Sequence, residues 1–212
     1  GAARNLLAMA SSHFCAAERQ FRTPLSYGAV RTPTAQWTAT AAGCCLLQPQ
    51  GEGVGIAAAT FGRVQDYQVK DINNMGAAMA PAAASTLLHY FKDTGTEPQE
   101  FDCIYTGDLG QVGSQLLREL LAAEGLLIKN HVDCGCILFD ANEQSVKSGG
   151  SGPGCCAAVL CGHILPRLRR GSQKRVLFTA TGALMSQTTF LQKETIPAVA
   201  HLVELRAPEK EK

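Results

Sequence analysis

The stretch SVKSGGSGPGCCAAVLCGHILPRLRRG, residues 145–171, places a glycine-rich turn directly before a predicted helix. A turn of this kind directs several backbone N–H groups to one side and can bind an anion. The same glycines would also let a strand and a helix approach each other closely, and the sequence leaves both interpretations open. We expect the helix to run from about residue 155 to residue 170 and to end at Gly171. One apolar face of this helix consists of Ala158, Cys161, Leu165 and Leu168.

Strands and helices alternate on both sides of this stretch, and the alternation predicts an α/β fold. The turn-like segment QGEG, residues 50–53, separates two strand-like segments and is typical of a β-hairpin. Residues 6–11 are expected to form a buried strand, because they are a short apolar run that ends in small polar residues. The predicted strands are residues 6–11, 37–47, 53–64, 101–106, 134–140, 174–182 and 196–206. The predicted helices are residues 13–22 (a helix or a turn), 73–91, 111–125 and 155–170.

The composition indicates a folded chain that does not bind nucleic acid. Hydrophobic residues make up 46% of the 212 residues and charged residues 17%, which is enough apolar material for a sizeable core. The net charge is +1, and nucleic acid binding needs a broader basic surface than this chain offers. No apolar run reaches the roughly 18 residues of a membrane-spanning helix, and no signal segment begins the chain. We therefore expect an intracellular protein without a membrane span.

The chain contains nine cysteines, mostly within apolar or small-residue runs, and no C-x-x-C pair. An odd number of cysteines does not suit a disulfide framework, so we predict a reducing compartment in which most cysteines are small core residues. Cys134 and Cys136 could bind a metal ion, but no second pair of ligands accompanies them. We expect neither a metal ion nor another cofactor.

Asp108 is a candidate site residue because it follows a predicted strand in the segment YTGDLGQVG, residues 105–113. Loops at the carboxyl ends of parallel strands form ligand crevices, so Asp108 could orient a ligand. It could also cap the following helix, which is the role that the local sequence favours. The segment loosely resembles a dinucleotide-binding loop, but it lacks the G-x-G pair of that motif.

Two further segments with candidate residues follow predicted strands. His13 lies in SSHFCAAERQFR beside serine and cysteine residues and could act as a general base, although a histidine with a structural hydrogen bond fits the same pattern. Gly182 and Ser186 lie in TATGALMS, which could be an ordinary turn. It could also be a second wall of the same pocket, with Ser186 and backbone N–H groups donating to an anion.

Several segments, in this order, resemble the stage V sporulation protein AD family. They are SSHFCAAERQFR, PTAQWT, NNMGAAMAPAAA, TGDLG, SGGSGPGCCA and ATGALMS, followed by ETIPAVAH. The resemblance implies a thiolase-like layered α/β fold with mixed sheets and with helices between and outside them. By this resemblance, the chain corresponds to the later two-thirds of such a protein. Approximately residues 1–70 would complete the first half with the hairpin, residues 71–206 would form the second half, and residues 207–212 would be a tail.

The resemblance also implies a function. Members of the family bind dipicolinic acid, which spore-forming bacteria load into the developing spore. The residues expected to bind it here are Ser151, Gly152, Ser186, Gly182, Asp108 and His13. Ser151 takes the position of the catalytic histidine of thiolases, and Asp108 falls at a second catalytic position, so the resemblance implies that no catalytic residue is present. The alternative is a thiolase- or ketosynthase-type acyltransferase acting on acyl-CoA or acyl carrier protein.

The partners and the location follow from the same resemblance. We expect the chain to work with other stage V sporulation membrane proteins, peripheral to the spore inner membrane, in the uptake of dipicolinic acid into developing spores. The chain could also form a homodimer. No nucleic acid partner is expected.

Overall fold

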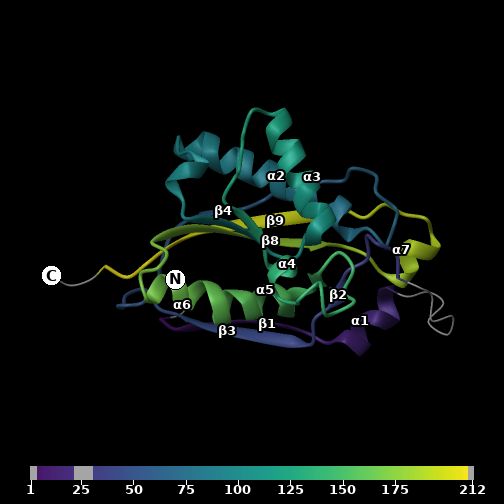
Figure 1. Cartoon of the computed structure of the whole chain (residues 1–212), viewed down its shortest axis with the longest axis horizontal. Helices are drawn as coiled ribbons and strands as arrows, with labels where there is room; N and C mark the ends of the chain where they lie inside the picture. Colours follow the sequence, from purple (N-terminus) through teal and green to yellow (C-terminus); the bar gives the residue numbers. More distant parts are fainter. Residues whose placement is uncertain (1–3, 22–30, 210–212) are drawn as a thin grey trace.

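The computed structural model describes residues 4–21 and 31–209, which form a layered α/β fold (Figure 1). The strands are β1 (Leu6–Ser12), β2 (Trp37–Thr38), β3 (Ala41–Leu47), β4 (Gly55–Thr60), β5 (Cys103–Thr106), β6 (His131–Asp133), β7 (Gly150–Ser151), β8 (Arg175–Ala183) and β9 (Ala198–Arg206). The α-helices are α1 (Phe14–Phe21), α2 (Met75–Thr94), α3 (Gly110–Ala123), α4 (Cys134–Ile137), α5 (Pro153–Val159), α6 (Leu165–Arg169) and α7 (Gln187–Leu191). A 3₁₀ turn, η2 (Pro98–Glu100), and a π-helical turn, η3 (Leu160–Ile164), complete the described elements.

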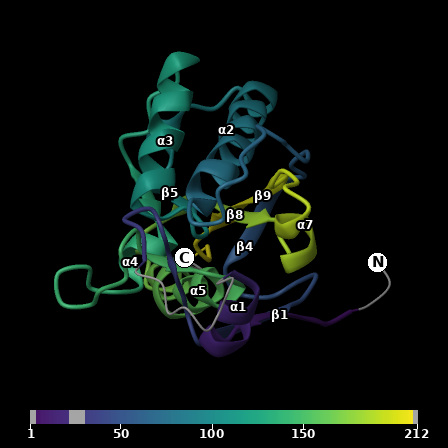
Figure 2. The same ribbon diagram turned by 90° about the vertical axis from the view of Figure 1, so that its right-hand side faces the viewer.

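The layers are visible in two views of the molecule. A five-stranded sheet lies in the middle, with α2 and α3 on one face and the helix that contains α5 and α6 on the other (Figures 1 and 2). The two-stranded sheet β1–β3 lies on the far side of that helix. We call the continuous segment α5–η3–α6 the central helix, because it lies between the two sheets.

The five-stranded sheet is mixed, in the order β4-β9-β8-β5-β6. β5 pairs in parallel with β6 and with β8, whereas β9 pairs antiparallel with β8 and β4. The predicted α/β fold with parallel and antiparallel pairs is confirmed. Because β5, β6 and β8 run in the same direction, their carboxyl ends meet at one edge of the sheet, where ligand sites are common.

α2 begins as the sequence predicts. The Asn74 side chain caps it by accepting a hydrogen bond from the Ala77 backbone N–H at 3.2 Å. Pro81 lies inside the helix and is buried. Gly76 lets α2 approach α3 closely, because a Cβ atom there would come within 2.6 Å of the Leu109 carbonyl oxygen. This close contact places the start of α3 over the sheet edge.

The central helix contains a π turn that the periodicity does not reveal. Each π turn adds one residue to a helix and shifts every later side chain around its axis. Of the four residues predicted to share an apolar face, Leu168 is buried, whereas Ala158, Cys161 and Leu165 are half-buried. Gly171 follows the helix with a φ angle of 74°, which confirms the predicted end. The buried residues of the central helix, besides Gly154, are Cys155, Val159, Ile164 and Leu168.

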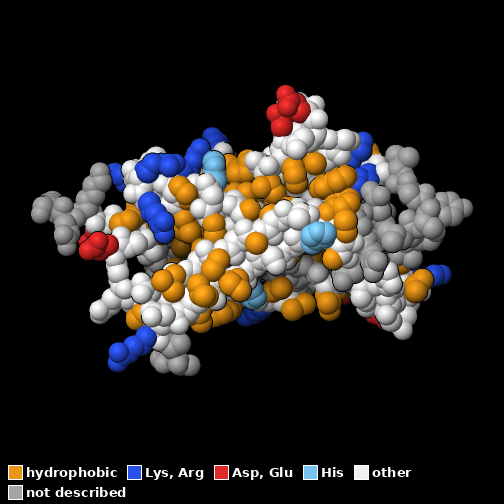
Figure 3. Space-filling model, turned by 90° about the horizontal axis from the view of Figure 1, so that it is seen from below, with side chains coloured by type: hydrophobic (Ala, Val, Ile, Leu, Met, Phe, Trp, Pro, Cys, Tyr) orange, Lys and Arg blue, Asp and Glu red, His pale blue; other side chains and the backbone are white. Residues whose placement is uncertain are grey.

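The predicted hairpin and the predicted burial of β1 are both wrong. β3 pairs antiparallel with β1, while β4 pairs with β9 in the other sheet, so the chain between β3 and β4 crosses from one sheet to the other. β1 is a strand as predicted, but only one face of β1–β3 lies against the central helix. The outer face exposes Leu7, Met9 and Leu46 by 62%, 73% and 59% (Figure 3).

The predicted strand at residues 134–140 is also wrong. β6 ends at Asp133, and the chain turns into α4 at Cys134. Gly135 lets α4 pack closely on the glycine-rich turn, because a Cβ atom at that position would clash with the Gly150 carbonyl oxygen.

Candidate functional site

Asp108 is the centre of a polar cluster at the carboxyl edge of the sheet. It is buried, with 7% of its surface exposed. Its Oδ2 accepts hydrogen bonds from the Ser151 hydroxyl at 3.2 Å and the Gly152 N–H at 2.8 Å, and its Oδ1 accepts from the Thr181 hydroxyl at 2.8 Å. Burial raises the pKa of Asp108, and the three donors oppose that shift. The structure thus joins three of the predicted site residues, Asp108, Ser151 and Gly152, and adds Thr181.

The loop before β2 holds the glycine-rich turn in place. β2 pairs in parallel with β7, so that Trp37 lies beside Gly150 and the turn is attached to a second strand. Gln36 Nε2 donates to the Asp108 carbonyl oxygen at 2.6 Å and to the Gly150 carbonyl oxygen at 3.0 Å. The segment PTAQWT therefore fixes the two loops that meet in the cluster.

The structure confirms that the glycines of this turn allow close packing, and it places a carboxylate of the chain beside the turn. Gly152 has a φ angle of 94°, which glycine adopts without strain. A Cβ atom at Gly154 would lie 2.6 Å from Ser12 Oγ, and the Gly154 N–H donates to that oxygen at 3.0 Å, so the turn packs closely on β1. The anion beside the turn is the Asp108 carboxylate, which belongs to the chain itself.

A second buried carboxylate, Asp133, caps α3 from the neighbouring strand. Asp133 accepts hydrogen bonds from the backbone N–H groups of Leu109 and Gly110, each at 2.9 Å, and from the Thr106 hydroxyl at 2.6 Å. Burial raises its pKa to about 6. The prediction that Asp108 caps this helix is therefore wrong, since Asp133 takes that role.

His131 connects Asp133 to the surface. Arg118 Nη1 lies 3.5 Å from His131 Nδ1, and His131 Nε2 lies 2.9 Å from Thr106 Oγ1. Arginine can only donate, so Nδ1 accepts and Nε2 carries the proton that it donates to Thr106. Burial, with Arg118 nearby, lowers the pKa of His131 to about 4. A directed series of hydrogen bonds thus runs from Arg118 to Asp133.

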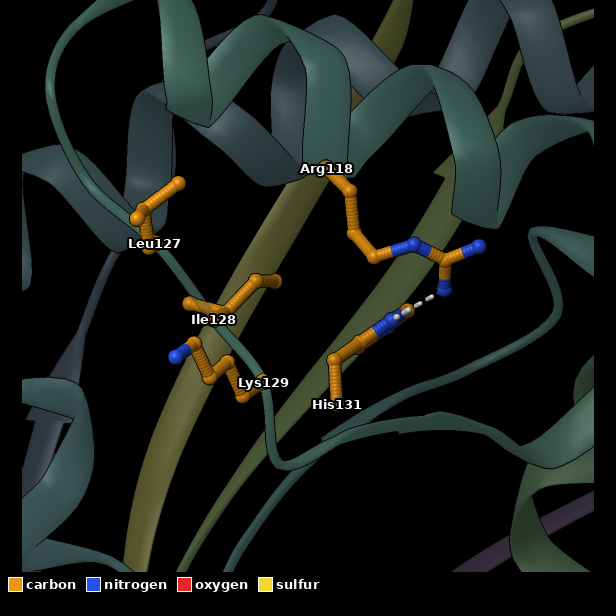
Figure 4. A pocket seen from close by; sticks show the side chains of 5 residues that line it. All are labelled: Arg118, Leu127, Ile128, Lys129 and His131. Carbon is orange, nitrogen blue, oxygen red and sulfur yellow. Dashed lines mark hydrogen bonds between the residues drawn. The ribbon is translucent and has the colours of Figure 1, made fainter.

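An open surface hollow of about 450 Å³ lies at the outer end of this series (Figure 4). Arg118 reaches it from α3, and His131 reaches it from the edge strand β6. The hollow lies away from the Ser151 turn, and none of the predicted site residues lines it. Its lining residues are Arg118, Leu127, Ile128, Lys129 and His131.

The three remaining predicted residues are not hydrogen bonded to Asp108. His13 is exposed, and its carbonyl oxygen accepts from the Ala17 N–H at the start of α1. Gly182 lies in β8, where a Cβ atom would have no neighbour within 4 Å. The interpretation that Gly182 lies in an ordinary turn is wrong, because it pairs with Val199 inside the sheet. Ser186 caps α7, with its Oγ accepting from the Thr189 N–H at 3.2 Å.

The cysteines lie in three kinds of surroundings. Cys103, Cys134 and Cys155 are buried in the core, but they are three of nine, so the prediction that most cysteines are core residues is wrong. Within residues 4–21 and 31–209, no three His, Cys, Asp or Glu side chains gather as ligands of a metal ion would. In the same part of the chain, no helix combines the length and the apolar character that crossing a membrane requires. The other cysteines are exposed or half-buried.

The layered arrangement is the thiolase-like fold of ketosynthases and related condensing enzymes. It matches the solved structure of the tetronic acid condensing enzyme AbyA1 with a TM-score of 0.55 and 14% identity, over 97% of this chain and 60% of that one. It also matches 3-oxoacyl-(acyl carrier protein) synthase III of Pseudomonas aeruginosa PAO1 with a TM-score of 0.53 and 14% identity, over 99% of this chain and 61% of that one.

The chain belongs to the stage V sporulation protein AD family, whose model matches residues 1–206. It is 43% identical to the stage V sporulation protein AD of Bacillus subtilis (strain 168) over 202 residues. That match covers 95% of this chain and 60% of the relative, so the chain spans less than two thirds of the relative's length. The resemblance inferred from the sequence is confirmed at the level of family and fold.

The sequence analysis did not identify Asp133 and Gln36, two polar residues at the carboxyl edge of the sheet. Asp133 was hidden because the strand was expected to begin at residue 134, one residue after the real strand ends. Gln36 lies in a loop whose partners are more than 70 residues away in the chain. The one available signal was position, since polar residues at the carboxyl ends of parallel strands face the same edge.

Proposed function

We propose that the chain binds dipicolinic acid (pyridine-2,6-dicarboxylate) without catalysing a reaction on it. Family membership supports a role in sporulation. The observation that carries the non-catalytic part is the chemistry of the Asp108 cluster. The described groups that donate to its carboxylate come from Ser151, Gly152 and Thr181, and none of them is a histidine. Acyl transfer of the thiolase kind needs a base of that type beside its nucleophile.

The proposed ligand lies beside Gly182 and Ser186, near the cluster. The open space at Gly182 would accommodate a flat aromatic ring, and the neighbouring hydroxyl groups could donate to a carboxylate. Asp108 is proposed to hold Ser151 and Gly152 in position, because its own negative charge would repel a carboxylate in direct contact. His13 would contribute from the adjacent start of α1, which follows the residue that binds the glycine-rich turn.

The partners and the location of the chain are part of the same proposal. The chain would act with other stage V sporulation membrane proteins in the uptake of dipicolinic acid into developing spores, peripheral to the spore inner membrane. A homodimer is a further part of the proposal.

The alternative function is that of an acyltransferase of the thiolase class. The observation in its favour is the fold that the chain shares with 3-oxoacyl-(acyl carrier protein) synthase III, although at 14% identity this likeness concerns the fold alone. In this alternative the substrates would be acyl-CoA or acyl carrier protein. A turnover assay with acetyl-CoA and acetoacetyl-CoA distinguishes the two functions, and turnover that Ser151→Ala abolishes would favour the enzyme.

Calorimetric titration with dipicolinate tests the binding proposal directly. Gly182→Val should abolish the heat of binding, because the side chain would fill the space assigned to the ligand. The variant should fold normally, since the position has room for a Cβ atom and valine suits a strand. Gly55→Val is the matched control, because Gly55 is also a strand glycine with an open Cβ position, at the opposite end of β9.

Ser186→Ala gives a second measurement at the same site. Loss of one hydrogen bond to a charged ligand should weaken binding by about 5- to 150-fold. The variant also loses the cap of α7 and should become less stable by about 1 kcal/mol, so its unfolding has to be measured separately. Unchanged affinity in both folded variants would show that the ligand does not bind at these residues.

A further inference from the structure

Two thiols meet where the central helix crosses the two-stranded sheet. Cys45 Sγ, on β3, lies 3.5 Å from Cys161 Sγ, in the π turn η3. The Cys161 thiol also lies 3.6 Å from the Cys44 carbonyl oxygen, to which it donates. Cys45 and Cys161 are both half-buried, so a small reagent can reach them. Cys44 is exposed on the opposite face of β3, because successive residues of a strand alternate.

The short distance between the sulfurs follows from how closely the helix lies on the sheet. A Cβ atom at Gly43 would clash with the Ala157 carbonyl oxygen, so only glycine allows this approach. Gly154, one turn earlier in the helix, packs equally closely on Ser12. Cys45 lies two residues after Gly43 on the same face of β3, and the π turn brings Cys161 over it. The pair is thus held in contact by backbone packing.

We infer that Cys45 and Cys161 form a reversible disulfide when the chain meets an oxidised low-molecular-weight disulfide, such as oxidised glutathione. The sulfurs need to move about 1.5 Å closer to reach bonding distance. In the first step, the Cys161 thiolate attacks the glutathione disulfide and releases one glutathione thiolate. In the second, the Cys45 sulfur attacks Cys161 in this mixed disulfide and releases the other. Two protein thiols are oxidised, one glutathione disulfide is reduced, and the two thiol protons pass to the released glutathione.

The surroundings of Cys45 set the order of these steps. Burial, followed by the hydrogen bond with Cys161, raises the pKa of the Cys45 thiol to about 11. Thiolates are the attacking species, so Cys45 is the poorer first nucleophile at neutral pH and reacts in the second step. The bond formed would tie the central helix to β3 and close a loop between positions that are 116 residues apart.

Incubation of the whole chain with oxidised glutathione, followed by mass spectrometry, tests the inference. The expected change at the pair is the loss of two hydrogens, about 2 Da, with glutathione carried only by other thiols such as the exposed Cys15 and Cys44. After tryptic digestion without reduction, the peptide of residues 32–63 should be linked to that of residues 148–167. The oxidised chain should also unfold at a temperature about 10 °C higher, because the bond constrains the unfolded chain.

Single substitutions identify the sulfurs, since each of the two peptides contains further cysteines. Cys45→Ser should abolish the link and leave Cys161 as a mixed disulfide, whereas Cys161→Ser should abolish the link and leave Cys45 mainly as a free thiol. Cys44→Ser is the matched control on the same strand and should keep the link. The inference is overturned if the native chain shows a link that survives Cys45→Ser, or only mixed disulfides, or no reaction at all. If a serine variant fails to fold, the alanine variant of the same cysteine provides the same test.

Discussion

Replacing His131 by asparagine should change how the stability of the protein depends on pH. His131 and Asp133 are both hydrogen bonded to Thr106, and their pKa values are shifted in opposite directions. Burial and the nearby Arg118 lower the pKa of His131 to about 4, and burial raises that of Asp133 to about 6. In the unfolded chain the two values return to about 6.5 and about 3.9. Between about pH 4 and pH 6, one proton therefore lies on Asp133 in the folded state and on His131 in the unfolded state.

The two shifts oppose each other in their effect on stability. Through Asp133 the folded state binds more protons in this range, so stability should fall by about 3 kcal/mol as the pH rises from about 4 to about 6. Through His131 the unfolded state binds more protons, so stability should rise by about 3 kcal/mol over nearly the same range. In the native chain the two contributions nearly cancel. His131→Asn removes only the rise, and Asp133→Asn removes only the fall.

The assay is urea-induced unfolding at about pH 4.5 and about pH 6, followed by the fluorescence of Trp37, the single tryptophan. His131→Asn should make the protein less stable at the higher pH, relative to the native chain, and Asp133→Asn should do the reverse. The control is His89→Asn, which changes an exposed histidine on α2. A His131→Asn variant whose stability changes with pH as the native chain's does would refute the argument, because His131 would then not gain a proton on unfolding.

Two further substitutions test how the layers are held together. Glu204, on β9, accepts hydrogen bonds from Tyr90 and Arg175, and although burial alone would raise its pKa, these donors lower it to about 2. Glu204→Gln should cost about 3 kcal/mol near neutral pH. The native chain should lose the same contribution as the pH falls from about 4.5 to about 2, and urea unfolding measures both. Gly43→Ala should lower stability by about 1–3 kcal/mol, because the added methyl clashes with the Ala157 carbonyl oxygen, and an unchanged melting temperature would contradict this.

The elements that the sequence predicts correctly are those whose cause is local. α2 has a capping asparagine at position 74, and α3 shows pairs of leucines four residues apart. β8 and β9 are long apolar runs that pair with each other, so their own residues largely determine them. The end of the central helix at Gly171 is equally local, because only a residue that tolerates a positive φ angle fits there.

The predictions are wrong where contacts between distant parts of the chain determine the local structure. The hairpin failed because β3 and β4 belong to different sheets, and their partners, β1 and β9, lie elsewhere in the sequence. The predicted face of the central helix is only partly correct, because the π turn at Leu160–Ile164 interrupts the regular helical period on which the prediction rests. The cap of α3 was assigned to the nearest acidic residue, Asp108, whereas a carboxylate on the next strand provides it.

Asp133, not Asp108, caps α3, and this assignment explains how the polar cluster at the carboxyl edge of the sheet is built. With Asp133 satisfying the start of α3, Asp108 is free to turn towards the glycine-rich stretch and to accept from Gly152 and Ser151. Three segments that are far apart in the sequence, PTAQWT, TGDLG and SGGSGPG, then meet through Gln36, Asp108 and the turn. A ligand carboxylate that took the Gly152 N–H would have to displace Asp108 from it. The binding site proposed here therefore depends on donors beyond this turn, and titration of Gly182→Val examines the space where they lie.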